Sequence, residues 1–265
     1  MKQGLIFMSL LILAITMSAC SNGGNNGNGG NNGNGGNSNG GGNGNSENSN
    51  GGNNGNGDHR ERHIPEGFGY IHEVIPDAKY DIRYYTDDNF VGTRVDGYLA
   101  PVAILTEEAL RALKNAADEL RKKGYGIIVF DGYRPQKAVD HFVRWARDPA
   151  DTLTKAKYYP EVDKADLFVK GYIAERSGHT RGSTIDLSLY DLETGEEVDM
   201  GSGFDLFGPP SHHDSGLVTP EQAAKRILLK ETMLRHGFLP YSREWWHYRL
   251  ADEPYPDTFF DFDVQ

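Results

Sequence analysis

The sequence contains a single cysteine among its 265 residues. One thiol excludes an intrachain disulfide framework, an iron–sulfur cluster and a cysteine-rich zinc ribbon. Basic residues are also few, since 27 Lys and Arg face 38 Asp and Glu and leave a net charge of −11. Proteins that bind nucleic acid present a basic face, so the acidic excess argues against nucleic acid as a partner. A small zwitterionic substrate remains compatible with this charge.

Apolar residues make up only 37% of the chain, and the deficit is concentrated in one segment. Residues 21–57 consist of 16 Gly, 16 Asn, four Ser and one Glu. These side chains gain nothing from burial, so the segment cannot offset the entropy cost of ordering. We therefore expect a disordered tether at 21–57, followed by one domain at 58–265. The latter segment has 208 residues of ordinary globular composition, which is enough to bury a core.

The first 20 residues have the features of a bacterial export signal. Lys2 precedes an apolar run at 5–15, and small residues and Cys20 follow. A positive start and a short apolar run are typical of a signal peptide, and the run is too short for a comfortable membrane span. Met17-Ser18-Ala19-Cys20 resembles a lipobox, which implies a lipid anchor at Cys20 and a location in the cell envelope, outside the cytoplasmic membrane. A plain signal peptide with an incidental cysteine is the alternative.

The hydrophobic patterns of 58–265 predict an α+β domain around a mostly antiparallel sheet. Thr106 is expected to cap one helix, and a capping box with a proline at the first helical position opens another at Thr219. We expect further helices at 135–147 and 164–175, and strands at 72–75, 80–85, 126–130, 183–189 and 244–250.

Two histidines and one aspartate have the pattern of a metal site. His179 lies in a glycine-containing turn, and Asp186 follows seven positions later on the polar face of the next predicted strand. His247 comes 61 residues after Asp186. Zinc takes such ligands and leaves a fourth position for water. The same spacing is compatible with a buried histidine and a capping aspartate that bind no metal.

Glu244, three residues before His247, is a candidate base that does not bind the metal. Positions 244 and 247 face opposite sides of a regular strand. Both can therefore reach one metal only if Glu244 leaves a turn at the start of the strand or if a bulge intervenes. The sequence Tyr241-Ser242-Arg243 favours the turn.

Five motifs occur in order along the domain. The main signature is Ser177-x-His179-x-x-Gly182-x-Thr184-x-Asp186, followed by Glu244-Trp245-Trp246-His247. The others are Tyr84-Tyr85-Thr86-x-Asp88-Asn89-Phe90-x-Gly92, Asp131-Gly132-Tyr133-Arg134-Pro135 and Asp199-Met200-Gly201-x-Gly203-Phe204-Asp205-x-Phe207 with Ser211-His212-His213. Together these motifs resemble the signature of the zinc D-alanyl-D-alanine dipeptidases, the VanX-type branch of a fold group that also holds D,D-carboxypeptidases and the Hedgehog signalling domain. Thr184 replaces the alanine of the family.

The resemblance covers about residues 68–250 and implies a role for each site residue. It implies one Zn²⁺ per domain on His179, Asp186 and His247; a general base, Glu244; an oxyanion-stabilising Arg134; and binding of the substrate amine by Ser177, Asp205 and Tyr98. The implied reaction is hydrolysis of the D-alanyl-D-alanine dipeptide to two D-alanines, in cell-wall turnover or scavenging.

Two alternatives to a dipeptidase stay open at this point. One is a D,D-carboxypeptidase that trims muropeptides, and the other is a non-catalytic, zinc-stabilised binding module. Glu244 and Arg134 argue against the module, because a structural zinc site needs neither a base nor an oxyanion partner.

Overall fold

The computed structural model describes residues 64–265. The predicted signal peptide, the lipid attachment residue Cys20 and the Asn/Gly-rich tether lie outside these described residues. Within 64–265, no helix combines the length and the hydropathy that crossing a membrane requires.

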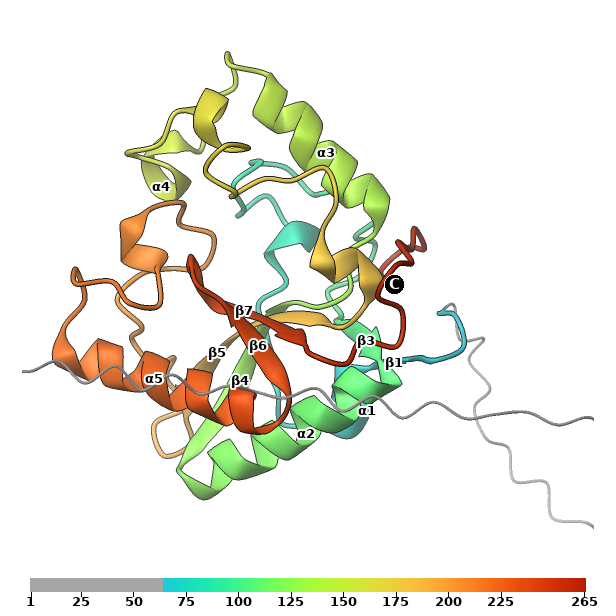
Figure 1. Ribbon diagram of the computed structural model, residues 1–265, viewed down its shortest axis with the longest axis vertical. Helices are drawn as coiled ribbons and strands as arrows, with labels where there is room; N and C mark the ends of the chain where they lie inside the picture. Colours follow the sequence, from blue (N-terminus) through green and yellow to red (C-terminus); the bar gives the residue numbers. More distant parts are fainter. Residues whose placement is uncertain (1–63) are drawn as a thin grey trace, which may run out of the picture. The chain divides into compact units, whose positions relative to one another are not determined.

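A five-stranded sheet crosses the domain in the order β2-β4-β5-β7-β6 (Figure 1). Its strands are β2 (Lys79–Tyr80), β4 (Tyr125–Asp131), β5 (Thr184–Asp191), β6 (Phe238–Tyr241) and β7 (Glu244–Leu250). Only the β2–β4 pair of this sheet is parallel. A separate antiparallel pair joins β1 (Phe68–Tyr70) to β3 (Ile104–Thr106). The predicted α+β class with a mostly antiparallel sheet is therefore confirmed.

Helices α2 (Glu107–Lys122) and α5 (Pro220–Arg235) lie next to each other along one side of the sheet, and α3 (Gln136–Arg147) lies on the other side (Figure 1). The predicted caps are present. The Thr106 side chain accepts a hydrogen bond from the Ala109 amide, and Thr219 forms a complete capping box with Gln222. Each such cap contributes about 1 kcal/mol by satisfying amides that have no partner within the helix.

Two predicted elements are wrong, and a third is correct at one residue only. The expected strand at 72–75 is the short helix α1 (Ile71–Val74), and the expected helix at 164–175 is only a 3-10 turn, Lys164–Asp166, after the short helix α4 (Lys155–Tyr158). Gly171 interrupts the second segment with a φ of +74°, and Val169 is 88% exposed. The apolar residues of this segment therefore do not share one helical face. Of the expected strand at 80–85, only Tyr80 is in β2, and Arg83–Tyr85 form a 3-10 turn.

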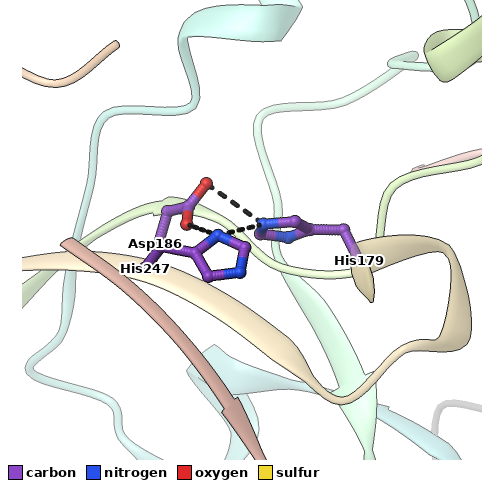
Figure 2. A group of neighbouring side chains, drawn as sticks. All are labelled: His179, Asp186 and His247. Carbon is purple, nitrogen blue, oxygen red and sulfur yellow. Dashed lines mark hydrogen bonds and ion pairs between the residues drawn. The ribbon is translucent and has the colours of Figure 1, made fainter. Parts of the chain in front are cut away.

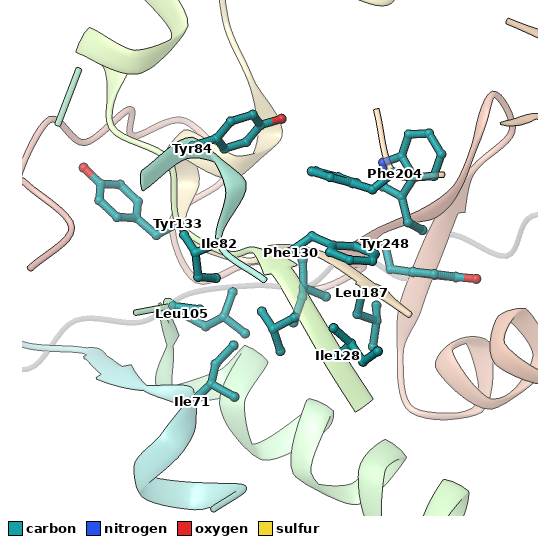
Figure 3. Close-up of a cluster of buried hydrophobic side chains, with 14 of the residues drawn as sticks. Ile71, Ile82, Tyr84, Leu105, Ile128, Phe130, Tyr133, Leu187, Phe204 and Tyr248 are labelled. Carbon is teal, nitrogen blue, oxygen red and sulfur yellow. The ribbon is translucent and has the colours of Figure 1, made fainter. Parts of the chain in front are cut away.

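The central strand β5 is buried on both faces, and Figure 3 shows one of its residues, Leu187, within a cluster of buried hydrophobic side chains. Ile185, Leu187 and Leu189 are fully buried, as the alternation predicts. Burial of each such side chain is worth about 1.5–3 kcal/mol. The polar face of the same strand is buried as well, including Asp186. This strand therefore holds the Asp186 carboxylate in a fixed position.

Candidate active site

Strand pairing places three site residues in one row across the sheet. Asp131 at the end of β4 pairs with Asp186 on β5, and Asp186 pairs with His247 on β7. His179 joins them from a 3-10 turn, Gly178–Arg181, directly before β5. Ser177 caps that turn by accepting a hydrogen bond from the His179 amide. Figure 2 shows that the two imidazoles and the Asp186 carboxylate converge on one point.

The three predicted ligands are within coordination reach of one another. The distance from His179 Nε2 to Asp186 Oδ2 is 3.3 Å, and that from His247 Nδ1 to Asp186 Oδ1 is 3.0 Å. The two imidazole nitrogens, His179 Nε2 and His247 Nδ1, are 3.2 Å apart. Ligands that bind zinc tetrahedrally at about 2.0–2.1 Å lie about 3.3 Å from each other. The spacing of these atoms therefore fits one Zn²⁺.

Hydrogen bonding around the ligands supports the same fit. His179 Nδ1 lies 2.7 Å from the carbonyl oxygen of Gly132, so this nitrogen carries the proton and leaves the lone pair on Nε2. Asp186 is buried, and its Oδ1 has no hydrogen-bond partner of acceptable geometry among the described residues. Although burial acts to raise it, the pKa of Asp186 lies well below its ordinary value because of His179 and His247. An ionised, unsatisfied carboxylate oxygen beside two imidazole nitrogens is a suitable donor set for a dication.

Glu244 is the first residue of β7 and leaves the turn at Ser242-Arg243, as the turn interpretation predicts. The register between β6 and β7 shifts at this point, so Glu244 and His247 approach each other on one side of the strand. The distance from Glu244 Oε2 to His247 Nδ1 is 3.5 Å. Burial raises the pKa of Glu244 to about 7. A general base works best with a pKa near the operating pH.

Arg134 lies in the connection between β4 and α3, and its guanidinium faces two carboxylates. Its Nε donates to Asp131 Oδ2 at 2.9 Å, and its Nη2 lies 3.5 Å from Asp186 Oδ2. The guanidinium also lies 5.1 Å from the ring centroids of Tyr84 and Phe142. These contacts hold the cation in one orientation beside the three metal ligands.

One cavity of about 300 Å³ contains most of the predicted site residues. The predicted residues that line it are His179, Asp186, His247, Glu244, Arg134, Ser177 and Asp205. Tyr98 does not line this cavity; it is buried, and its hydroxyl donates to Asp131 Oδ1 at 2.7 Å. The structure therefore brings together every predicted site residue of the domain except Tyr98, which reaches the site only through Asp131.

Asp131 and Tyr84 are site residues to which the sequence assigned no role. Asp131 accepts hydrogen bonds from Tyr98 and Arg134, and its Oδ2 lies 3.6 Å from His179 Nδ1. The Tyr84 hydroxyl donates to Asp205 Oδ2 at 2.8 Å, and burial raises the pKa of Asp205 well above its ordinary value. Tyr84 and Asp131 each begin one of the motifs that resemble the family, so those motifs could have identified them as site residues.

Sequence comparisons with known proteins identify the family of this chain. The family model described as D-ala-D-ala dipeptidase matches residues 65–265. A D-alanyl-D-alanine dipeptidase of Streptomyces coelicolor is 47% identical over 197 residues, covering 74% of this chain and 98% of that protein. One of Enterococcus faecalis is 48% identical over 198 residues, covering 75% and 98%. The solved vancomycin resistance D,D-pentapeptidase VanY in complex with Zn(II) aligns with a TM-score of 0.36 at 19% identity, over 58% of this chain and 77% of that one. The resemblance inferred from the motifs is confirmed, and the chain belongs to the D-alanyl-D-alanine dipeptidase family of metallopeptidases.

Proposed function

We propose that the protein hydrolyses the dipeptide D-alanyl-D-alanine to two molecules of D-alanine. The observation that carries this proposal is the convergence of His179, Asp186 and His247 with a partly buried Glu244 and a fixed Arg134 on one cavity. A metal site that only stabilised the fold would need neither the Glu244 carboxylate nor the Arg134 guanidinium. The names of the curated relatives support the choice of dipeptide.

The residues around the cavity can supply each part of peptide hydrolysis. A Zn²⁺ ion held by His179, Asp186 and His247 would polarise the scissile carbonyl and lower the pKa of water to about 7. Glu244 accepts the proton of the attacking water and then delivers it to the leaving amine. The guanidinium of Arg134 donates to the carbonyl oxygen as negative charge develops there.

Two residues that line the cavity, Asp205 and Ser177, can bind the free amine of the substrate. Asp205 is 6% exposed and has only the Tyr84 hydroxyl as a side-chain donor among the described residues. A substrate ammonium close to Asp205 would favour the ionised form of this carboxylate. Ser177 lines the same cavity and can orient the peptide. A free amine is therefore part of what the site recognises.

Replacement of Glu244 tests this proposal. Glu244→Gln keeps the size of the side chain but removes the base, so the purified protein should retain one zinc. Turnover of D-alanyl-D-alanine should fall by about 10²–10⁴-fold. Release of D-alanine measured on the dipeptide and on a pentapeptide stem separates a dipeptidase from a D,D-carboxypeptidase. Unchanged turnover in the variant would remove the mechanism, and loss of zinc would make Glu244 a ligand.

We further propose that a lipid on Cys20 anchors the enzyme outside the cytoplasmic membrane, where the 21–57 segment tethers the catalytic domain, 58–265. The support is the sequence pattern alone, in which the apolar run at 5–15 is followed by a lipobox-like segment, 17–20, that contains the single cysteine. A segment of 37 residues would reach about 30–37 Å. Fatty-acid labelling of the wild type should be lost in Cys20→Ser, and persistent labelling would contradict the anchor.

A further inference from the structure

A second buried arginine, Arg226 on α5, lies in a region that the reaction does not use directly. It is 1% exposed, and no carboxylate of the described residues forms an ion pair with it. A buried cation without a paired anion is costly, so its hydrogen bonds must satisfy it fully. Its partners therefore indicate what the side chain holds in place.

All three nitrogens of the Arg226 guanidinium bind the loop at residues 199–214, which also carries Asp205. Nε donates to the Met200 carbonyl at 2.6 Å, and Nη1 donates to the His212 carbonyl at 2.9 Å. Nη2 donates to Ser202 Oγ at 3.3 Å. The bonds lie on both sides of Asp205 in the sequence. A single planar group thus fixes the separation between the two ends of the loop.

The same network connects the loop to the strand of the catalytic base. The Trp245 indole nitrogen donates to Ser202 Oγ at 2.9 Å, and Trp245 directly follows Glu244. The Arg226 guanidinium also lies 5.7 Å from the Trp245 ring centroid. We call Arg226, Ser202 and Trp245 the loop clamp. The clamp links the residue proposed to bind the substrate amine with the strand that presents the base.

The backbone of Asp205 explains why this loop needs such a clamp. Asp205 has a φ of +62° and is the single non-glycine residue with a positive φ in the described part of the chain. A non-glycine residue in this conformation costs about 1–3 kcal/mol and persists only where its surroundings determine it. Phe204, the residue directly before Asp205, stacks on Phe130 with the ring centroids 4.6 Å apart. Aromatic packing and the clamp together hold the strained turn.

We infer that Arg226 is a positioning residue for substrate binding, which keeps the Asp205 carboxylate aimed at the amine of the dipeptide. This inference rests on the proposed function. Arginine suits the position because its planar group offers five donors in a fixed fork, whereas lysine offers three donors from one atom. A lysine cannot reach the Met200 and His212 carbonyls in the same geometry. Arg226→Lys therefore keeps the positive charge and removes the planar arrangement of donors.

The test uses kinetics of the full chain with D-alanyl-D-alanine. Arg226→Lys should raise KM by about 10–100-fold, a loss of the size typical when a residue that orients a metal ligand is replaced, with a smaller effect on kcat and unchanged zinc content. In an Asp205→Asn background, Arg226→Lys should raise KM little further, because the carboxylate that Arg226 positions is already absent. Arg235→Gln, on the same helix but bonded to Glu119 on α2, is the matched control and should leave KM unchanged.

Two further measurements keep the inference testable if Arg226→Lys folds poorly or the wild type does not cleave the dipeptide. Ser202→Ala removes the hydroxyl that accepts from both Arg226 and Trp245 but leaves the bonds from Arg226 to the Met200 and His212 carbonyls, so it should raise KM in the same direction by a smaller factor. Amide hydrogen exchange at 200–212 should accelerate in Arg226→Lys and not in Arg235→Gln, whatever the substrate. Inactivity of the wild type with this exchange pattern would overturn the proposed function alone. An unchanged KM, fully additive effects with Asp205→Asn, or unchanged loop exchange would overturn the role of Arg226.

Discussion

The regions around Arg134 and Arg226 each depend on one arginine, but the two arginines serve different purposes. Arg134 lies beside two carboxylates, Asp131 and Asp186, within a cluster of charged groups. Arg226 binds two backbone carbonyls and one hydroxyl, and burial lowers its pKa to about 10. The first region therefore balances charge, while the second region fixes a backbone shape around a cation that still carries its proton at neutral pH.

The difference shows that Arg134 acts on the reaction through its charge, whereas Arg226 acts through the geometry of its hydrogen bonds. The charge of Arg134 is aimed at the cavity, where a carbonyl oxygen gains negative charge during the reaction. The charge of Arg226 strengthens three hydrogen bonds to one loop, and bonds from a charged donor are each worth about 1.5–3 kcal/mol. Substitutions at the two sites should therefore change different kinetic parameters.

Of the substitutions that test this comparison, Arg134→Lys should have the largest effect. A lysine keeps one positive charge near Asp131 but loses the planar donors that face the substrate carbonyl. We expect kcat to fall by about 10²–10³-fold while zinc content stays at one per chain. Steady-state kinetics and metal analysis check this outcome. A variant whose defect lay entirely in KM would make Arg134 resemble Arg226 and remove the contrast between the two regions.

A smaller effect should come from the loop that Arg226 holds. Gly201 has a φ of +83°, and an added Cβ would lie 2.6 Å from Val218 Cγ1. Gly124, at the end of α2, has a φ of +88° and nothing within 4 Å. Gly124→Ala should cost about 1–2 kcal/mol from the left-handed backbone alone. Gly201→Ala should cost about 1–3 kcal/mol more because of overpacking.

Urea unfolding of the two glycine variants measures this difference, and KM provides a second readout. Gly201→Ala should also raise KM, since it distorts the loop of Asp205, whereas Gly124→Ala should not. Equal losses of stability in the two variants would mean that the loop moves freely enough to accept the methyl group. That result would weaken the view of the clamp as a rigid support.

The smallest effect should come from replacing Glu119, whose carboxylate accepts hydrogen bonds from Arg235, an exposed arginine on the same helix as Arg226. Hydrogen bonds from Arg235 and Lys123 hold the pKa of Glu119 well below its usual value. A carboxylate with a depressed folded-state pKa stabilises the fold above its unfolded pKa, about 4.3, and this contribution is lost as the pH falls below that value. Glu119→Gln should therefore lower the free energy of unfolding by about 0–1 kcal/mol near neutral pH.

Comparison of wild type and Glu119→Gln across pH checks the sign of this effect. The difference in the free energy of unfolding should shrink as the pH falls from about 6 to about 3, because over this range the unfolded wild-type chain takes up a proton at Glu119 while the folded protein, with its depressed pKa, does not. A difference that stayed constant with pH would show that the ion pair contributes nothing and that only side-chain packing had changed.

Elements with a clear local pattern could be predicted from the sequence. The strand at 244–250 is observed with these bounds, and the capping box at Thr219 begins α5 as expected. The helix predicted at 164–175 was wrong because tertiary contacts prevail there. Lys164 is buried and donates to the carbonyls of Trp145 and Asp148 at the end of α3.

The predicted site shows the same division between local pattern and tertiary contact. Motifs pointed to His179, Asp186 and His247, which the structure brings together. The contacts of Asp131 depend on the pairing of β4 with β5, which no local pattern encodes. Arg226 was missed for a similar reason, since in the sequence it is one basic residue on a helix with no special spacing.

The most direct test of the central claim is anomalous X-ray diffraction at the zinc absorption edge from crystals of the purified protein. The account predicts one strong peak bounded by His179 Nε2, the Asp186 carboxylate and His247 Nδ1, with Glu244 outside bonding distance. A peak held by other residues, or no peak in crystals of protein that cleaves D-alanyl-D-alanine, would contradict it.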